Sequence, residues 1–213
     1  MIGEVLFMKL VNITKLTDEK FLNYYKLEYE HEGQKIFWTM ASRNKPENLV
    51  CVTGKDKADT VYMIPKVIVD GKEYLVLTKE FRQPIGDYVY SFPAGVVDEG
   101  EEPEVSCLRE MNEEIGAEEF ESVAPLTGIC YNSEGMTDES VIVYEVVVTK
   151  FGKANLQDHE DIKTFFVPID ELEDFIKGKR LSTRAAMYCP MIAREYKLKK
   201  EIESMKNQEQ PGN

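Results

Sequence analysis

Residues 95–117 read GVVDEGEEPEVSCLREMNEEIGA and carry an unusual density of glutamates. Its second half predicts a helix that ends at Gly116. At about 100° per residue, one face of this helix is apolar and the other carries Glu110, Glu113 and Glu114. The apolar face is expected to contain Val105, Leu108, Met111 and Ile115. Carboxylates three and four residues apart repel each other, so their presence needs an explanation.

Two explanations compete at this point. Charge runs usually keep a helix face solvated, and the glutamates could do no more than that. A helix used only for solubility would more naturally carry lysines four residues from its glutamates, however, and the preceding SFPAGVVDEGE is rich in glycine. A carboxylate cluster that faces one point suits Mg²⁺, which takes oxygen ligands from few carboxylates and from substrate phosphates. The pattern therefore favours a divalent-cation site.

Composition sets further limits on function. The chain has 213 residues, is 43% hydrophobic and carries a net charge of −13, which opposes binding to nucleic acids and to anionic membranes. The start of the sequence lacks a basic signal-peptide region, and no apolar run is long enough to span a bilayer, so we expect a cytoplasmic protein. The four cysteines have no disulfide or zinc spacing, which predicts reduced thiols.

The chain is expected to divide near Lys55. Residues 1–55 contain FLNYYKLEYE, KIFWTMASR and NLVCV, three short runs that predict a small antiparallel sheet. Residues 56–196 form the larger domain, with a hairpin turning at Asp70-Gly71 and strands at YVYSFPAGVV, ESVIVYEVVVTK and IKTFFVP. Helices follow at IDELEDFIKG and from about Ser182, where Pro190 should kink or divide the helix. Residues 197–213 are expected to be a helix end and a frayed tail, KNQEQPGN.

The residues from Gly95 to Gly116 resemble the Nudix box. Gly95, Glu101, the pair Arg109-Glu110, the pair Glu113-Glu114 and Gly116 match its identities and spacing, and Ala117 stands where a bulkier aliphatic residue is usual. This resemblance implies an α+β Nudix fold, with a mixed β-sheet between helices and here a small N-terminal antiparallel sheet. It also implies hydrolysis of a nucleoside diphosphate derivative with two to three Mg²⁺ or Mn²⁺ ions.

A second resemblance narrows the family. KEFRQPIGDYVYSFPAG and FWTMASR are similar to segments of the ADP-ribose pyrophosphatase subfamily, which hydrolyses ADP-ribose and related ADP-sugars to AMP and a sugar phosphate. The chain departs from that subfamily at Glu134, where proline is common between Ser133 and Gly135, and at Ser91, where an acidic residue is common. The alternatives are a Nudix hydrolase for another nucleoside diphosphate derivative and a Nudix-like sensor that binds without cleaving.

These resemblances imply roles for individual residues. The metal ligands would be the Ala94 carbonyl, Glu110, Glu113 and Glu114. The catalytic residues would be Glu114, Glu160 as the base, and Arg109 as an orienting cation. Asp158 and Glu139 are rivals of Glu160. The substrate-binding residues would be Trp38, stacked on adenine, with Arg43, Arg82 and Gly135.

Strand alternation places Trp38 and Arg43 on opposite faces of their expected strand. A twist, a bulge or two subunits would be needed to bring both to one ligand. The N-terminal strands carry Phe21, Tyr24, Tyr25, Phe37 and Trp38. So small a sheet cannot bury both of its faces, and we therefore expect a homodimer paired through residues 1–55.

Overall fold

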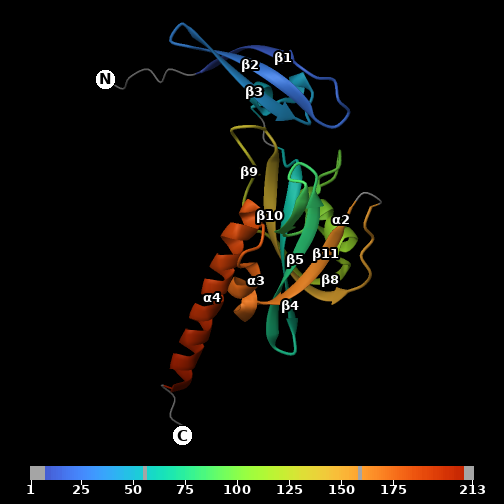
Figure 1. Cartoon of the computed structure of the whole chain (residues 1–213), viewed down its shortest axis with the longest axis vertical. Helices are drawn as coiled ribbons and strands as arrows, with labels where there is room; N and C mark the ends of the chain where they lie inside the picture. Colours follow the sequence, from blue (N-terminus) through green and yellow to red (C-terminus); the bar gives the residue numbers. More distant parts are fainter. Residues whose placement is uncertain (1–7, 55–56, 158–159, 209–213) are drawn as a thin grey trace, which may run out of the picture. The chain divides into compact units, whose positions relative to one another are not determined.

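The computed structural model describes residues 8–54, 57–157 and 160–208. The chain separates into two compact units (Figure 1). Unit 1 contains residues 1–60 and 127–142, and unit 2 contains residues 61–126 and 143–213. The division at Lys55 did not anticipate that residues 127–142 join the N-terminal unit. No helix within the described ranges is long and apolar enough to cross a membrane.

Unit 1 is built on a three-stranded antiparallel sheet of order β1-β2-β3. Its strands are β1 (Lys9–Lys15), β2 (Asn23–His31) and β3 (Gln34–Ser42). A small core of Tyr25, Leu27, Met40 and Leu49 lies on one face of this sheet. The small antiparallel sheet expected at the N-terminus is therefore confirmed.

The strand expected at NLVCV is wrong. A 3₁₀ turn, η1 (Pro46–Asn48), and a single helical turn, α1 (Val50–Thr53), occupy this segment. Gly54 ends the turn in a left-handed conformation and donates its N–H to the Val50 carbonyl. An apolar run this short has no periodicity that separates a strand from a helix. The third strand is β1, which the sequence analysis missed.

The second segment of unit 1 lies beside β3. The Ala41 N–H donates to the Met136 carbonyl at 2.9 Å, and β9 (Cys130–Tyr131) precedes this contact along the chain. On the opposite face, Tyr24 and Phe37 are each 51% exposed, and Phe21, just before β2, is 71% exposed. On the core side of the sheet, Trp38 is also 51% exposed. The sheet thus presents more apolar surface than its small core covers.

Unit 2 carries most of an eight-stranded sheet of order β11-β5-β4-β10-β8, with β6 paired to β5, β7 to β4 and β9 to β10. The strands are β4 (Thr60–Val69), β5 (Lys72–Arg82), β6 (Asp87–Ser91), β7 (Ala94–Val96), β8 (Ala117–Pro125), β10 (Ser140–Phe151) and β11 (Ile162–Pro168). The hairpin at Asp70-Gly71 is confirmed, because both residues have positive φ and join β4 to β5. The polar strand β8 was not foreseen.

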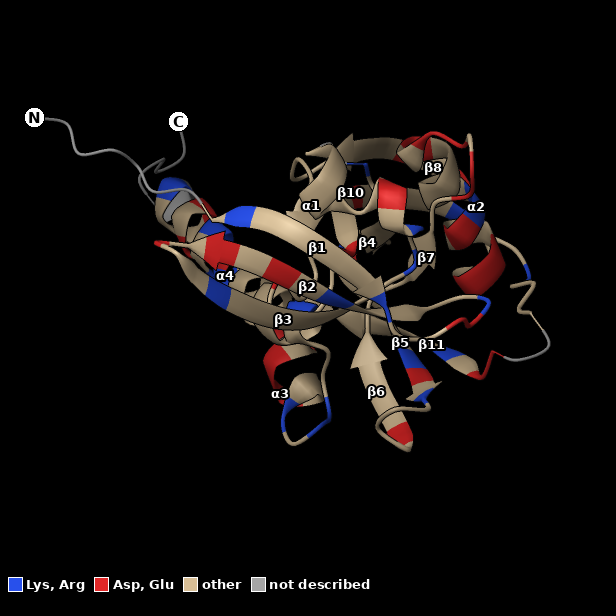
Figure 2. Cartoon of the chain, turned by 90° about the horizontal axis from the view of Figure 1, so that it is seen from above, with Lys and Arg blue, Asp and Glu red and all other residues tan. Residues whose placement is uncertain are grey.

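Helices cover both faces of this sheet. One side is covered by α2 (Pro103–Ile115), and the other by α3 (Leu172–Ile176) and α4 (Thr183–Gln208), as Figures 1 and 2 show from two directions. A 3₁₀ turn, η2 (Ile169–Glu171), leads into α3. The mixed sheet between helices is therefore confirmed.

Pro190 was expected either to kink or to divide the last helix, and helix α4 is not divided there. It runs unbroken through Pro190 for 26 residues, and Lys206–Gln208, expected in a frayed tail, belong to it. Ala185, Cys189 and Ala193 are each at most 1% exposed and lie on both sides of the proline. Their burial offsets the roughly 3 kcal/mol that an interior proline costs a helix.

Gly116 gives a test of this fold. Its φ is +72°, and an added Cβ would lie 2.6 Å from the Gly152 carbonyl oxygen. We expect Gly116→Ala to lower the free energy of unfolding by about 2–4 kcal/mol, because backbone strain and a clash with fixed backbone add together. Gly178 has the same φ of +72° and nothing within 4 Å of its added Cβ. The control Gly178→Ala should therefore cost only about 1 kcal/mol. Equal losses in urea unfolding would show that the Gly152 contact is unimportant.

Candidate active site

The site begins where α2 lies against β7. An added Cβ on Gly95 would lie 1.9 Å from the Glu110 carboxyl carbon, so the Glu110 side chain occupies the space that any other residue would fill. The Ala94 N–H donates to Glu114 Oε2 at 3.2 Å. Gly116 then ends the helix in a left-handed conformation and donates its N–H to the Asn112 carbonyl. The glycines of this segment thus bring β7 and the helix glutamates together.

The face of α2 that packs differs from the one expected. Val105, expected in the core, is 53% exposed, whereas Glu110 and Glu114 are each only 7% exposed. These carboxylates are buried beside Cys107, Met111 and Ile115. The buried stripe is rotated toward the glutamates because β7 approaches α2 through Gly95. The solvated-face explanation is therefore wrong for Glu110 and Glu114.

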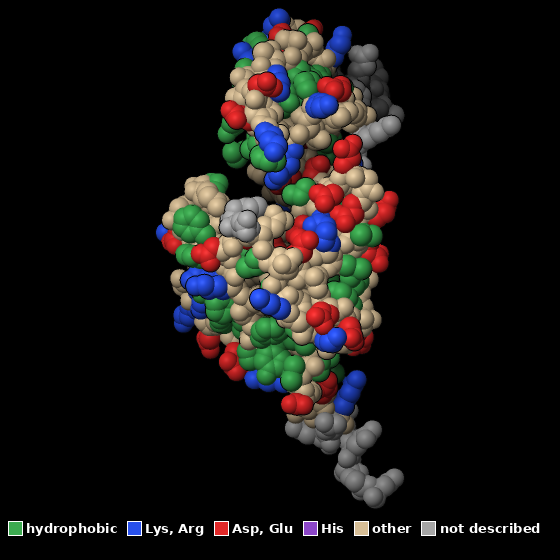
Figure 3. All heavy atoms as spheres, turned by 90° about the vertical axis from the view of Figure 1, so that its right-hand side faces the viewer, with side chains coloured by type: hydrophobic (Ala, Val, Ile, Leu, Met, Phe, Trp, Pro, Cys, Tyr) green, Lys and Arg blue, Asp and Glu red, His purple; other side chains and the backbone are tan. Residues whose placement is uncertain are grey.

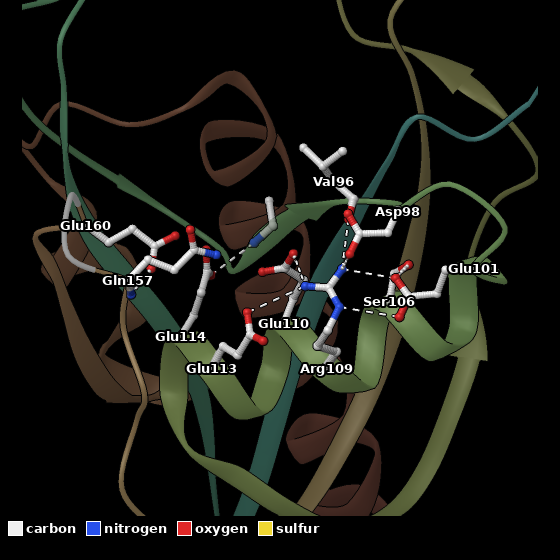
Figure 4. A network of polar contacts seen from close by, with 11 residues as sticks. Val96, Asp98, Glu101, Ser106, Arg109, Glu110, Glu113, Glu114, Gln157 and Glu160 are labelled. Carbon is white, nitrogen blue, oxygen red and sulfur yellow. Dashed lines mark hydrogen bonds and ion pairs between the residues drawn. The ribbon is translucent and has the colours of Figure 1, made fainter. Parts of the chain in front are cut away.

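Arg109 connects the acidic residues of this segment (Figure 4). Its guanidinium donates to Glu110 Oε1 at 2.7 Å, to Glu101 Oε2 at 3.0 Å and to the Val96 carbonyl at 3.0 Å. It also reaches Glu113 Oε2 at 3.5 Å. The hydrogen bonds from Arg109, followed by that from Ser106, lower the pKa of Glu101 to about 2. Arg109 therefore contacts three carboxylates of this segment, and its role in orienting them for catalysis stays a prediction.

The two buried glutamates are electrostatically strained. Burial raises the pKa of Glu114 well above its usual range, and repulsion from Glu110, Glu80 and Glu160 adds to this effect. Burial also raises the pKa of Glu110, and the hydrogen bond from Arg109 opposes the rise only in part. Perturbed carboxyl groups of this kind are typical of functional sites. A nearby cation would relieve the strain.

The carboxylate Glu80 was missed by the sequence analysis. It shares a face of β5 with Arg82, which it binds at 3.0 Å, and burial raises its pKa. Strand alternation from Arg82 is the signal that could have identified it, since residues two apart on a strand face the same way. Arg82, expected to contact the ligand, thus lies next to the carboxylate cluster in unit 2.

Glu160 also lies near this cluster. Its Oε2 accepts the Gln157 N–H at 2.9 Å, and its charge raises the pKa of Glu80, Glu110 and Glu114. Figure 4 shows Glu160 on the side of the cluster where Glu114 lies. Its rival Asp158 lies outside the described residues. The other rival, Glu139, belongs to unit 1 and binds Arg43 at 3.1 Å.

The donor set of this site fits a hard divalent cation. Within the described ranges, no three His, Cys, Asp or Glu side chains are grouped so that they could hold a metal ion by themselves. Mg²⁺ is commonly held by one or two carboxylates together with waters and substrate phosphates. Two buried carboxylates with raised pKa values suit that arrangement, because a divalent cation would compensate both charges.

The other predicted substrate-binding residues belong to unit 1. The Trp38 indole N–H donates to the Gly135 carbonyl at 3.0 Å, which joins two of these residues. Trp38 lines a cavity of about 420 Å³ whose walls include Leu27, Tyr29 and Met136. Arg43 lines a different cavity, with Tyr24 and Glu139. Met40 lines both cavities, and Arg43 follows the end of β3 at Ser42, so the placement of Trp38 and Arg43 on opposite faces stays a prediction.

Figures 2 and 3 show where charged side chains lie on the chain. Acidic side chains gather on and around α2 (Figure 2). The face drawn in Figure 3 mixes acidic and basic side chains with apolar patches.

Comparison with known proteins agrees with this geometry. A family model described as the NUDIX domain matches residues 61–186. An uncharacterised Nudix hydrolase of Schizosaccharomyces pombe is 29% identical over 184 residues, which cover 81% of this chain and 85% of that protein. The ADP-sugar pyrophosphatase of Mus musculus is 35% identical over 104 residues. This match covers 47% of the chain and 44% of the mouse protein, so the chain spans less than half of that relative.

A solved structure supports the fold alone. The crystal structure of an ADP compounds hydrolase superposes with a TM-score of 0.68 and covers 91% of this chain and 96% of that chain, at 14% identity. The family match contains β7, the glycines at its end and the glutamates of α2. With these findings, the chain belongs to the Nudix hydrolase family.

Proposed function

We propose that this protein hydrolyses the diphosphate bond of ADP-ribose or a related ADP-sugar, and releases AMP and a sugar phosphate. The observation that carries the proposal is the burial of Glu110 and Glu114 beside the Gly95 backbone, each only 7% exposed. Buried carboxylates that repel each other are costly unless a cation compensates them. The name of the mouse relative, ADP-sugar pyrophosphatase, supports the substrate class.

The cation would be Mg²⁺ or Mn²⁺, in two to three ions. Glu110, Glu113, Glu114 and the Ala94 carbonyl would hold these ions together with the substrate diphosphate. When bound, the ions supply the positive charge that stabilises the charge developing on the phosphate oxygens. They also allow a chain of net charge −13 to bind an anionic substrate.

Other residues of the chain would orient the carboxylates, accept a proton and contact the substrate. Arg109 keeps Glu110 and Glu101 in place through its hydrogen bonds of 2.7 Å and 3.0 Å. Glu160 would accept the proton of the attacking water. Its negative charge lies close enough to Glu114 and Glu110 to raise the pKa of both. Arg82 would exchange its contact with Glu80 for one with the substrate. Each of these groups belongs to unit 2.

Adenine would bind at Trp38. The indole is 51% exposed, its N–H is held by Gly135, and its cavity is lined mainly by apolar side chains. A rigid, half-exposed ring beside an apolar cavity suits stacking on a purine. Arg43 would take part from the other face of the strand in a homodimer paired through residues 1–55. The exposed Phe21, Tyr24 and Phe37 support such a pairing, because no described residue of the chain covers them.

A substrate panel tests the proposal directly. The enzyme, supplied with Mg²⁺ or Mn²⁺, should release AMP fastest from ADP-ribose or another ADP-sugar, and EDTA should abolish the reaction. Turnover by metal-free protein would contradict the metal dependence. Faster hydrolysis of a nucleoside diphosphate derivative without adenine would assign the enzyme to another substrate. The departures at Ser91 and Glu134 make that comparison informative.

The variant Glu114→Gln separates the metal site from the fold. We expect kcat to fall more than about 100-fold, because one charge that holds the cation is lost. The metal-free variant should nevertheless be more stable than the wild type near pH 8. Because the pKa of Glu114 is raised in the folded protein, this carboxyl group costs the wild type no stability at pH values below its unfolded pKa. The wild type loses stability as the pH rises above that value, and the loss is complete once the pH has passed the folded pKa.

Thermal unfolding of the metal-free variant checks this sign. The melting temperature should rise by about 2–4 °C or more at pH 8, and by less at pH 5. Glu102→Gln, at an exposed glutamate just before the same helix, is the matched control and should change neither kcat nor stability. A Glu114→Gln variant with wild-type kcat would show that this carboxylate holds no cation.

Trp38→Ala tests the adenine site. Stacking on a base contributes about 1–3 kcal/mol, so KM for ADP-ribose should rise roughly 5- to 150-fold. The kcat should change little, because the contact is the same in the ground and transition states. Trp38→Phe is the matched variant, since its smaller ring keeps part of the stacking and should recover part of the loss. If both variants kept the wild-type KM, Trp38 would serve only for packing.

A further inference from the structure

Helix α4 has a second apolar face that nothing in the described part of the chain covers. Ala185, Cys189 and Ala193 pack against the body of unit 2 and are at most 1% exposed. A separate set of large apolar side chains on the same helix is between 47% and 61% exposed: Met187, Met191, Leu198, Ile202 and Met205. We call this second set the outer stripe. A helix needs only one apolar face to pack on its own domain.

The outer stripe is narrow and continuous. At about 100° per residue its five members fall within about 60°, roughly opposite Ala185 and Cys189. Met191, Leu198 and Met205 recur every seven residues, which is the spacing of a helix that packs along another helix. The stripe is about 27 Å long, at 1.5 Å per residue. Its shape therefore matches a partner helix of similar length.

The end of α4 also lacks support within the chain. Every side chain from Lys197 to Lys206 is exposed, and Figure 1 shows this end of the helix extending past α3 and the sheet. The ion pair between Lys197 and Glu173, at 2.5 Å, marks the start of this extension. Helical segments of about 12 residues are marginal in water by themselves. A partner on the outer stripe would supply the missing packing.

Two charged residues beside the outer stripe indicate which kind of helix it would bind. Arg194 and Glu201 lie on the same edge of the outer stripe and are exposed. Other charges of this helix are paired within it, as in Glu195 with Lys199 at 2.8 Å and Lys200 with Glu203 at 3.5 Å. No ion pair recorded for the described residues includes Arg194 or Glu201, although Arg194 adds to the effect of Lys197 in lowering the pKa of Glu173.

We infer that the outer stripe binds the α4 helix of a second copy of this chain, in antiparallel orientation about a two-fold axis at Leu198. In this register Leu198 meets its own counterpart once, on the axis, whereas the contacts of Met191 with Met205 and of Arg194 with Glu201 each occur twice. A two-fold contact must be self-complementary, and this arrangement satisfies both the apolar and the charged residues. The contact uses no residue of the proposed active site or of the N-terminal sheet.

Disulfide trapping in the full-length protein tests the contact. The exposed Cys51 and Cys130 are replaced by serine, and cysteine is introduced by Leu198→Cys on the two-fold axis. Lys200→Cys is the control, because it lies two residues further along the same exposed helix but faces away from the stripe. Paired helices give an effective thiol concentration near millimolar, so Leu198→Cys should form disulfide-linked dimers at least about tenfold faster than the control at micromolar protein.

A charge exchange identifies the orientation. Adding Arg194→Glu to the Leu198→Cys protein should slow trapping several-fold, and adding Glu201→Arg to that variant should restore the rate. Trapping no faster than in the Lys200→Cys control would overturn the inference. So would a wild-type chain that sediments with phosphatidylserine vesicles while Leu198→Cys shows no trapping, since the stripe would then bind a membrane. Because trapping reports only on α4, its result is independent of the substrate and of pairing through residues 1–55.

Discussion

The contact between the Gly95 backbone and the Glu110 side chain is the constraint on which the rest of the site depends. The missing Cβ of Gly95 leaves room for the Glu110 side chain against the β7 backbone, and Glu110 and Glu114 are both buried there. Burial raises the pKa of both carboxyl groups. Their negative charges are therefore destabilising unless a positive charge compensates them. The same geometry orients Arg109, because its guanidinium bridges Glu110 and the Val96 carbonyl.

The buried carboxylates and the glycine beside them belong to one short segment of the protein, residues 94–116. The hairpin at Asp70-Gly71 follows ordinary turn chemistry. Electrostatic strain gathers in the buried carboxylates of the site, which Arg109 compensates only in part. The proposed cation would relieve this strain on binding.

The part of the chain that the structure describes leaves two apolar surfaces exposed. The sheet of unit 1 leaves Phe21, Tyr24 and Phe37 exposed, and the outer stripe of α4 leaves five further side chains exposed. Their chemistry differs, because the first surface is aromatic and formed by strands, whereas the second is a narrow helical seam with opposite charges on one edge. Each surface is therefore suited to a different partner surface, and neither needs the other to form.

The sequence by itself determined the features that depend on local chemistry. Gly116 ends α2 and Asp70-Gly71 turns the hairpin, because few residues adopt positive φ, and the spacing from Gly95 to Gly116 indicated the Nudix fold and its cluster of glutamates. Only the tertiary structure decided what depends on distant neighbours. Val105 is exposed while Glu114 is buried, NLVCV forms a helical turn, Glu80 joins the carboxylates, and residues 127–142 pack with the N-terminal sheet. Periodicity states which residues share a face, but the element that packs against that face determines whether water reaches it.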